Sequence, residues 1–277
     1  MRVDVLADLH THTTHSDGSL SPLELVQKAG DLGVSILGIT DHDTVGALDE
    51  AIEGGKTVGV EVIPGMELSA SSPDGEIHVL GYFMDYHSPT LTEALTIFRQ
   101  KRIERIERIV GKLNRMKIPL TVESVLAEAT GDSVGRPHIA SALVNQGHAA
   151  SYHQAFNKYI GEGRPAFEKK DEFSPEDTIR LIAGAGGLSF LAHPGRSVDD
   201  QLLHSLIKSG LDGIEVYHPS HSPERIEFFR GVVSEYFLLE SGGSDFHGGM
   251  KKDEHLLGRI GVPPASVDIM RRRLFPH

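Results

Sequence analysis

Histidine and carboxylate side chains recur in short clusters along this chain, and the first cluster spans residues 8–12 (DLHTH). On a β-strand, His10 and His12 project from the same face, because side chains alternate with a period of two. Two imidazoles on one face suit a divalent metal ion. Asp17 follows in a short His-Ser-Asp-Gly loop. Two polar residues at a strand end would explain the histidine pair equally well, so its meaning depends on the rest of the chain.

Similar side chains stand at or near the ends of later apolar runs. A capped turn or a solvated acid would explain each of them singly, but their joint occurrence at strand tips predicts one shared site. Imidazole and carboxylate ligands without thiolate suit Zn²⁺, Mn²⁺ or Fe²⁺. The residues are His42 after 36–40, Glu67 at the end of 60–67, His78 within 77–82, His193 after 187–192, and Asp245 and His247 after 238–242.

Composition limits the class of protein. The chain has 277 residues, 39% of them hydrophobic, which suits one α/β barrel with an insertion. The absence of cysteine excludes disulfides and thiolate sites and agrees with a cytoplasmic location. No signal peptide and no run of about 20 apolar residues is present, so we predict no membrane partner. A net charge of −12 does not suit a nucleic-acid coat protein, although bound divalent ions can reverse the field within a cleft.

Helical segments alternate with these apolar runs. Ser21, Ser174 and Ser222 each precede a proline and predict helix starts, with the helices running to about residues 30, 183 and 235. Strands that alternate with helices predict a parallel sheet, open or closed. Ligands at several strand ends favour a barrel, because that face gathers residues from distant strands.

The region between residues 85 and 167 breaks this rhythm. A long helical pattern runs from Thr90 to Lys117, and further helical pieces follow to Lys158. We predict a helical insertion that caps one side of the barrel mouth. Because Glu104 and Glu107 interleave with the basic residues of the long helix, we expect a solvated face there. Those basic residues are Arg102, Arg105, Arg108, Lys112 and Arg115.

Together these clusters resemble the polymerase-and-histidinol-phosphatase (PHP) family, within the wider amidohydrolase-like metal barrels. The matching blocks follow the family's order over residues 8 to 247. The resemblance implies a distorted (β/α)7 barrel formed by residues 1–88 and 168–277, with a helical insertion domain at 89–167. The blocks are Asp8–His12, His15–Gly18, Ile39–His42, Pro64–Glu67, His78, Ala192–Pro194 and Gly243–His247.

The resemblance also implies two to three divalent metal ions (Mn, Fe or Zn). One ion would take His10, His12, Glu67 and Asp245; a second would share Glu67 and add His78 and His193; a third would take Asp17, His42 and His247. A hydroxide that bridges two metals would attack phosphorus, since metal binding lowers the pKa of water to about 7. His193 and Asp245 are the candidate catalytic side chains, which would transfer a proton as well as bind metal. Asp8 is expected to orient a neighbouring ligand.

Basic side chains near these blocks could bind an anionic substrate, because the guanidinium fork of arginine matches phosphate. A salt bridge at the surface or between domains remains the alternative for each of them. The candidates are Arg136 and His138 in the insertion, Arg164 near its end, Arg196 after the His193 turn, and His218 and His221 after the next strand.

The insertion, Arg136-Pro137-His138 and Gly163-Arg164-Pro165 resemble the nucleotide-directed PHP subgroup. That resemblance implies a phosphoesterase acting on a 3′,5′-bisphosphonucleotide or on a short 5′-phosphorylated oligonucleotide, RNA or DNA. Histidinol phosphate phosphatase or another small-molecule phosphatase is the alternative in the same class, together with a polymerase-associated proofreading domain. A metal-stabilised regulatory or binding module without turnover is the alternative of another class. The sequence leaves the native metal and the oligomeric state open.

Overall fold

The computed structural model describes residues 7–72, 75–169, 173–195, 198, 200–249 and 252–275. In this part of the chain, strands in chain order form one seven-stranded sheet. The backbone N–H of Leu9 donates to Gly242 at 3.1 Å and that of His12 donates to Phe246 at 2.9 Å, so the first and last strands meet and nearly close a barrel. The strands are β1 (Ala7–Asp8), β2 (Ile36–Ile39), β3 (Glu61–Ser72), β4 (Gly75–Tyr82), β5 (Leu188–Leu191), β6 (Gly213–Tyr217) and β7 (Leu239–Gly242).

Strand β4 departs from the predicted parallel sheet. It runs antiparallel to both β3 and β5, whereas the remaining neighbours are parallel. The prediction is wrong here because β4 starts directly after β3 ends, and a parallel neighbour needs a crossover of about a dozen residues. Glu67 does not end its strand either, since β3 continues to Ser72. The β3–β4 pair therefore brings Glu67 and His78 together from adjacent strands.

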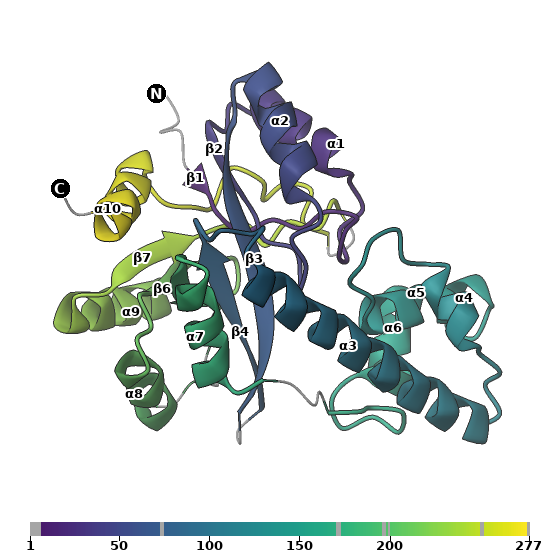
Figure 1. Ribbon diagram of the computed structural model, residues 1–277. Coiled ribbons are helices and arrows are strands. Elements are labelled where there is room, and N and C mark those ends of the chain that lie inside the picture. Colours follow the sequence, from purple (N-terminus) through teal and green to yellow (C-terminus); the bar gives the residue numbers. More distant parts are fainter. Residues whose placement is uncertain are drawn as a thin grey trace.

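Helices cover the outside of the barrel (Figure 1). The three predicted Ser-Pro starts are confirmed: Ser21, Ser174 and Ser222 each accept a hydrogen bond from the backbone N–H three residues later. At Ser21 the side chain of Glu24 returns the contact and completes a capping box. These barrel helices are α1 (Pro22–Asp31), α2 (Leu48–Val58), α7 (Pro175–Gly184), α8 (Asp200–Lys208), α9 (Pro223–Tyr236) and α10 (Pro264–Leu274).

A second helical region lies beside the barrel (Figure 1). It has its own hydrophobic cluster, drawn from residues 106–166. The first half of its longest helix packs elsewhere, because Leu91, Leu95 and Phe98 belong to a cluster of the barrel. The exact division at residues 89 and 167 stays a prediction. The elements are α3 (Pro89–Arg115), α4 (Val122–Leu126), α5 (Arg136–Asn145), α6 (Tyr152–Ala155) and the π-helical turn η1 (Phe156–Ile160).

Among the residues given above, no helix is long and apolar enough to cross a membrane.

Candidate metal centre

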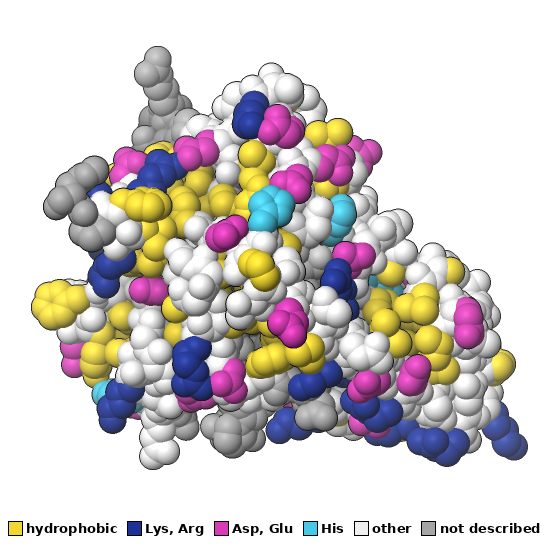
Figure 2. Space-filling model, viewed as in Figure 1, with side chains coloured by type: hydrophobic (Ala, Val, Ile, Leu, Met, Phe, Trp, Pro, Cys, Tyr) yellow, Lys and Arg dark blue, Asp and Glu magenta, His cyan; other side chains and the backbone are white. Residues whose placement is uncertain are grey.

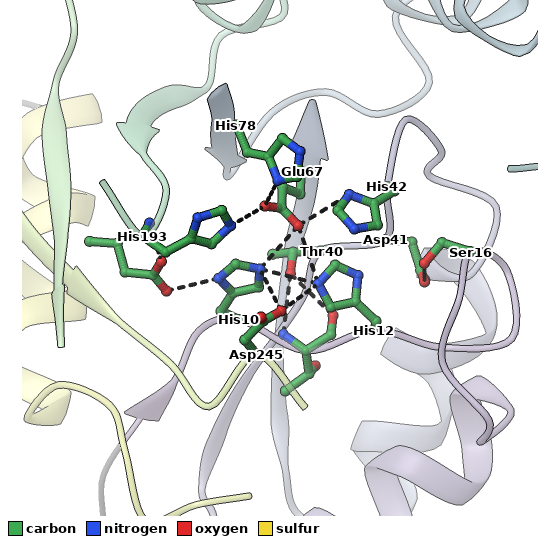
Figure 3. A network of polar contacts seen from close by, with 12 residues as sticks. His10, His12, Ser16, Thr40, Asp41, His42, Glu67, His78, His193 and Asp245 are labelled. Atoms are coloured by element: carbon green, nitrogen blue, oxygen red, sulfur yellow. Dashed lines mark hydrogen bonds and ion pairs between the residues drawn. The ribbon is translucent and has the colours of Figure 1, made fainter. Parts of the chain in front are cut away.

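Four side chains converge at the mouth of the barrel to form the first ligand group (Figure 3). The Nε2 atom of His12 lies 3.3 Å from Glu67 Oε2 and 3.2 Å from Asp245 Oδ1. His10 Nε2 lies 3.2 Å from the same Glu67 oxygen. The four ligand atoms lie within 4.8 Å of one another. This is the set predicted for one metal, namely His10, His12, Glu67 and Asp245.

The second ligand group contains Asp17, His42 and His247. Asp17 Oδ1 lies 3.2 Å from His247 Nε2 and 3.9 Å from His42 Nε2. His12 joins these three, with its Nδ1 atom 3.9 Å from the same carboxylate oxygen. His12 thus offers a different ring nitrogen to each group, which the sequence did not indicate.

Glu67 also connects a third set of imidazoles (Figure 3). Its Oε1 atom lies 2.7 Å from His78 Nδ1 and 2.9 Å from His193 Nε2, the two partners predicted for it. Its Oε2 atom lies 3.2 Å from His42 Nδ1, so His42 stands between this set and the second group. The structure therefore brings the nine predicted ligand residues into one connected cluster, in which five imidazoles contact Glu67. That they bind metal stays a prediction.

Two observations test whether these residues fit divalent cations. Burial alone would lower the pKa of His12, yet the carboxylates of Asp245 and Glu67 raise it to about 9. Burial would likewise lower the pKa of His78, but the carboxylates of Glu67 and Glu76 together raise it to about 10. Among the described residues, His12 Nδ1 and His42 Nδ1 are also buried without a hydrogen-bond partner, which is rare for buried polar atoms. The buried carboxylates favour positive charge at this site, and the two ring nitrogens make no hydrogen bond. Both observations fit divalent ions.

Glu215 is a functional residue that the sequence analysis missed. It lies on β6, fully buried, and its Oε1 atom is 2.8 Å from His10 Nδ1. Its other oxygen accepts the backbone N–H of His193 at 2.7 Å. A carboxylate behind a ligand imidazole fixes the ring's orientation and raises its basicity. The available signal was an acid inside the otherwise apolar run 213–217, where burial requires a partner.

Asp8 also holds the site from behind. It accepts the backbone N–H of Ser244 at 2.9 Å and of Gly258 at 3.0 Å, which fixes the turn that carries Asp245. Burial raises the pKa of Asp8 to about 6. These contacts agree with the expectation that Asp8 orients a neighbouring ligand.

The loop that presents Asp17 is fixed by Asp41. The Asp41 carboxylate accepts the backbone N–H of Thr13 at 2.8 Å and the hydroxyl of Ser16 at 2.5 Å. Only glycine fits after Asp17, because a Cβ at Gly18 would lie 2.4 Å from the carbonyl oxygen of His12. Asp41 therefore acts on the loop and is not part of the ligand groups described above.

Three non-glycine residues of the site have left-handed backbone conformations. The φ angles are 27° for His193, 52° for Asp245 and 51° for Asp43. Such conformations cost of order 1–3 kcal/mol each and persist where the surroundings impose them. For His193, the hydrogen bond from its backbone to Glu215 supplies that constraint.

A cavity of about 310 Å³ opens between the ligand groups and the cap helices. Its walls include Arg136 and His138, as expected for substrate residues. They also include Tyr152 and Phe156, which the sequence analysis did not single out. Arg136 lies with its guanidinium 5.8 Å from the centre of the Phe156 ring and 5.5 Å from that of Phe167.

The solvated face predicted for the basic residues of α3 is wrong at Arg102 and Arg105. Both line the cavity, and Arg105 is buried with its guanidinium donating to the carbonyl of Glu168 at 2.8 and 3.0 Å. The alternation with Glu104 and Glu107 suggested a solvated face. The segments around Val134 and Glu168, however, pack against the side of α3 that carries the two arginines. Arg108 and Arg115 are exposed as predicted, and Figure 2 shows Lys and Arg side chains gathered toward the outer end of α3.

The remaining predicted substrate residues take different positions. His218 lies in a recess with His193 and Asp245, its Nε2 atom 3.5 Å from Asp245 Oδ2. His221 is buried: its Nδ1 pairs with the carbonyl of Val216 at 2.9 Å, and its Nε2 accepts the N–H of Gly195 at 3.4 Å, so it supports the His193 turn. Arg164 is exposed on the cap, and Arg196 lies outside the described residues.

A known domain matches the part of the chain that carries the candidate ligands from His10 to His78. The PHP domain matches residues 8–168. The chain belongs to the PHP domain family. This confirms the predicted family, and membership in a family of metal-dependent phosphoesterases implies divalent metal ions.

Two curated PHP relatives match most of the chain. A 5′-3′ exoribonuclease of Haemophilus influenzae is 36% identical over 87% of this chain and 89% of its own length. A 3′,5′-nucleoside bisphosphate phosphatase of Chromobacterium violaceum is 32% identical over 87% of this chain and 86% of its own. Both relatives hydrolyse phosphate esters, which confirms the predicted class of phosphoester hydrolase.

A solved structure confirms the predicted barrel fold. A protein of Bifidobacterium adolescentis, named as a candidate metal-dependent phosphoesterase, superposes with a TM-score of 0.88 at 32% identity. The match covers 96% of this chain and 95% of that one. The barrel fold is therefore shared with a solved structure over almost the whole chain.

Proposed function

We propose that this protein hydrolyses a phosphate ester of a nucleotide, either a 3′,5′-bisphosphonucleotide or a short 5′-phosphorylated oligonucleotide. The observation that carries the proposal is the junction between the ligand groups and the cap cavity. His42 and His78 belong to both, so an anion in the cavity lies against the ligands. Two curated relatives whose names specify nucleotide or RNA substrates support the same substrate class.

The nine ligand residues would hold two to three divalent ions of Mn, Fe or Zn. When bound, such ions lower the pKa of a coordinated water and neutralise phosphate charge. Glu67 has a central part because its two oxygens face imidazoles of every group. The nine are His10, His12, Asp17, His42, Glu67, His78, His193, Asp245 and His247.

His193 and Asp245 are our candidates for proton transfer to the leaving oxygen. Both line a recess with His218, and their side chains are 27% and 21% exposed, whereas that of His10 is fully buried. An exposed edge allows a side chain to touch substrate as well as metal. Glu215 holds the backbone of His193, and through it the ring, in one orientation.

The cap would recognise the nucleoside part of the substrate. Tyr152 and Phe156 line the cavity with ring centres 5.0 Å apart, and aromatic faces stack on any base. Arg136 and His138 occupy the neighbouring wall, where a guanidinium can pair with a phosphate. We propose residues 89–167 as this cap. Arg164, Arg196, His218 and His221 remain proposed substrate residues, of which His218 lies beside the ligands.

Phosphate release tests the proposal directly. The purified protein, with Mn²⁺ added, is assayed on 3′,5′-bisphosphoadenosine, a 5′-phosphorylated trinucleotide and histidinol phosphate. We expect turnover of one or both nucleotide substrates, loss of turnover on chelation and recovery when Mn²⁺ is restored. Turnover of histidinol phosphate alone would reject the nucleotide substrate. Absence of turnover on every ester, with bound metal confirmed by elemental analysis, would favour a binding module.

A further inference from the structure

Arg102 of the cap helix α3 reaches across to the barrel. Its Nε donates to Asp43 Oδ2 at 2.7 Å, and its Nη2 contacts the same oxygen. Its remaining nitrogen, Nη1, donates to the carbonyl of Val134 at 3.2 Å, directly before helix α5. The side chain is 10% exposed and that of Asp43 is 0% exposed. One guanidinium therefore joins α3, the start of α5 and the turn after β2.

Asp43 holds the segment that carries His42. Its backbone N–H donates to the carbonyl of Glu67 at 3.0 Å, and its carboxylate accepts the N–H of Ser69 at 2.8 Å. His42 itself forms an isolated parallel bridge with Glu67. The left-handed backbone of Asp43 costs energy that these contacts must offset. Because Asp43 is fully buried, its charge depends on Arg102 for a close cation.

The cap also contacts the other side of the second ligand group. His138 of α5 lines the same cavity as Ser16, next to Asp17. The hydroxyl of Thr130 donates to the carbonyl of Thr14 at 2.8 Å. Gly131, in the loop before α5, lies against His15, in the loop that presents Asp17. A Cβ at Gly131 would lie 2.2 Å from the Cα of His15. The loop before α5 is thus packed against the loop that presents Asp17.

The first ligand group depends on other supports. Glu215 fixes His10 from β6, and Asp8 fixes the turn that carries Asp245. These supports come from the barrel strands and not from the cap helices. The two groups therefore differ in which part of the molecule positions them.

We propose that Arg102 is a positioning residue that lets the cap hold the second ligand group, formed by Asp17, His42 and His247. This inference rests on the proposed metal-dependent function. Removal of Arg102 releases the His42 segment and weakens one class of metal sites. The first group, held by the barrel, keeps its affinity. Cap position and metal occupancy are then coupled in the same protein.

Mn²⁺ binding by the full-length protein tests this inference. Calorimetric titration with Mn²⁺ gives the affinity of each class of site, and elemental analysis after gel filtration gives the ions retained per chain. For Arg102→Ala we expect one class to weaken about 10- to 100-fold, the range seen when an outer support of a metal ligand is lost. The other class, which we assign to the first ligand group, should keep its affinity within about 3-fold of wild type. Arg99→Ala, a neighbouring exposed arginine on α3 paired with Asp132, is the matched control and should leave both classes unchanged.

A double variant separates positioning from the cost of a stranded charge. Arg102→Ala leaves the buried Asp43 carboxylate unpaired, which alone destabilises a protein. Arg102→Met combined with Asp43→Asn removes both charges and retains an acceptor for Ser69. We expect the double variant to show the same loss of Mn²⁺ affinity at one class of site. Normal Mn²⁺ affinity in the double variant, or in Arg102→Ala, would overturn the inference. A wild-type protein that binds no Mn²⁺ would instead reject the proposed function and this inference with it.

Discussion

The two ligand groups share His12 but are built in different ways. The group of His10, Glu67 and Asp245 rests on carboxylates of the barrel, which are buried within the strands and the loops that join them. The group of Asp17, His42 and His247 lies where loops of the barrel meet the cap. One part of this site therefore belongs to the fold itself, while the other depends on an inserted region.

Replacement of Glu67 should have the largest effect, because its oxygens face both groups. Glu67→Gln keeps the volume and removes the charge that balances the cations. We expect kcat/KM for phosphate release to fall ~10³-fold or more, since metals stabilise the transition state by several kcal/mol. Metal content should fall as well. Glu61→Gln on the same strand, whose carboxylate is half exposed and paired with Arg271, is the control. Activity within 10-fold of wild type would contradict a shared central ligand.

Replacement of Glu215 should act on the first group and on His193, and leave the second group unchanged. Glu215→Gln weakens the contact that orients His10, and such losses cost about 10- to 100-fold in metal affinity or activity. In a Mn²⁺ titration, the class of site that weakens should be the one that Arg102→Ala leaves intact. Glu240→Gln on the next strand, partly exposed beside the Tyr217 hydroxyl, serves as the control. If both variants weakened the same class, the two groups would not be held separately.

Replacement of Arg136 should affect substrate more than metal. The side chain lines the cavity and lies over two phenylalanine rings. Loss of a charged hydrogen bond to phosphate costs about 1.5–3 kcal/mol, so Arg136→Ala should raise KM about 10- to 100-fold with kcat nearly unchanged. Metal content should match wild type. Arg164→Ala, at an exposed position on the cap, provides the comparison. An equal rise in KM for Arg164→Ala would show that phosphate binding extends beyond this cavity.

The smallest effect is expected at the exposed pair between Arg99 and Asp132. These side chains are 36% and 56% exposed and lie 2.8 Å apart. Exposed ion pairs contribute about 0.2–1 kcal/mol. Arg99→Ala should therefore lower the free energy of unfolding in urea by less than about 1 kcal/mol. A loss as large as that of Arg102→Ala would show that the cap is held by its surface rather than by its buried contact with the barrel.

The candidate metal ligands could be predicted from the sequence. The ligand histidines and acids stand out because polar side chains rarely end apolar runs without a reason, and their order matches the PHP family. Glu215 was not predicted because it lies inside a strand, whereas the predicted ligands were recognised by their positions at strand ends. The seven strands were identified, yet the direction of β4 was not, because periodicity gives no information about orientation.

Arg102 and Arg105 show a different limit. A local pattern of alternating charge describes a helix face, but burial of that face depends on segments that lie 30 or more residues away in the chain, such as Val134 and Glu168. His221 shows the reverse case. It follows a strand end like the ligands, yet its ring turns inward and pairs with the backbone. Such outcomes depend on tertiary packing.

The length of α3 has a consequence for how such a protein can diversify. Its 27 residues span about 40 Å, and only its first part packs in the barrel. All nine candidate ligands lie outside residues 89–167. An exchange of the outer cap with that of a relative, beginning after Arg102, would therefore replace the surfaces that choose a substrate and keep every candidate ligand. The new cap must still supply the contacts that Thr130 and Val134 make with Thr14 and Arg102. With those contacts retained, the helix offers a junction at which specificity can change without replacement of a ligand.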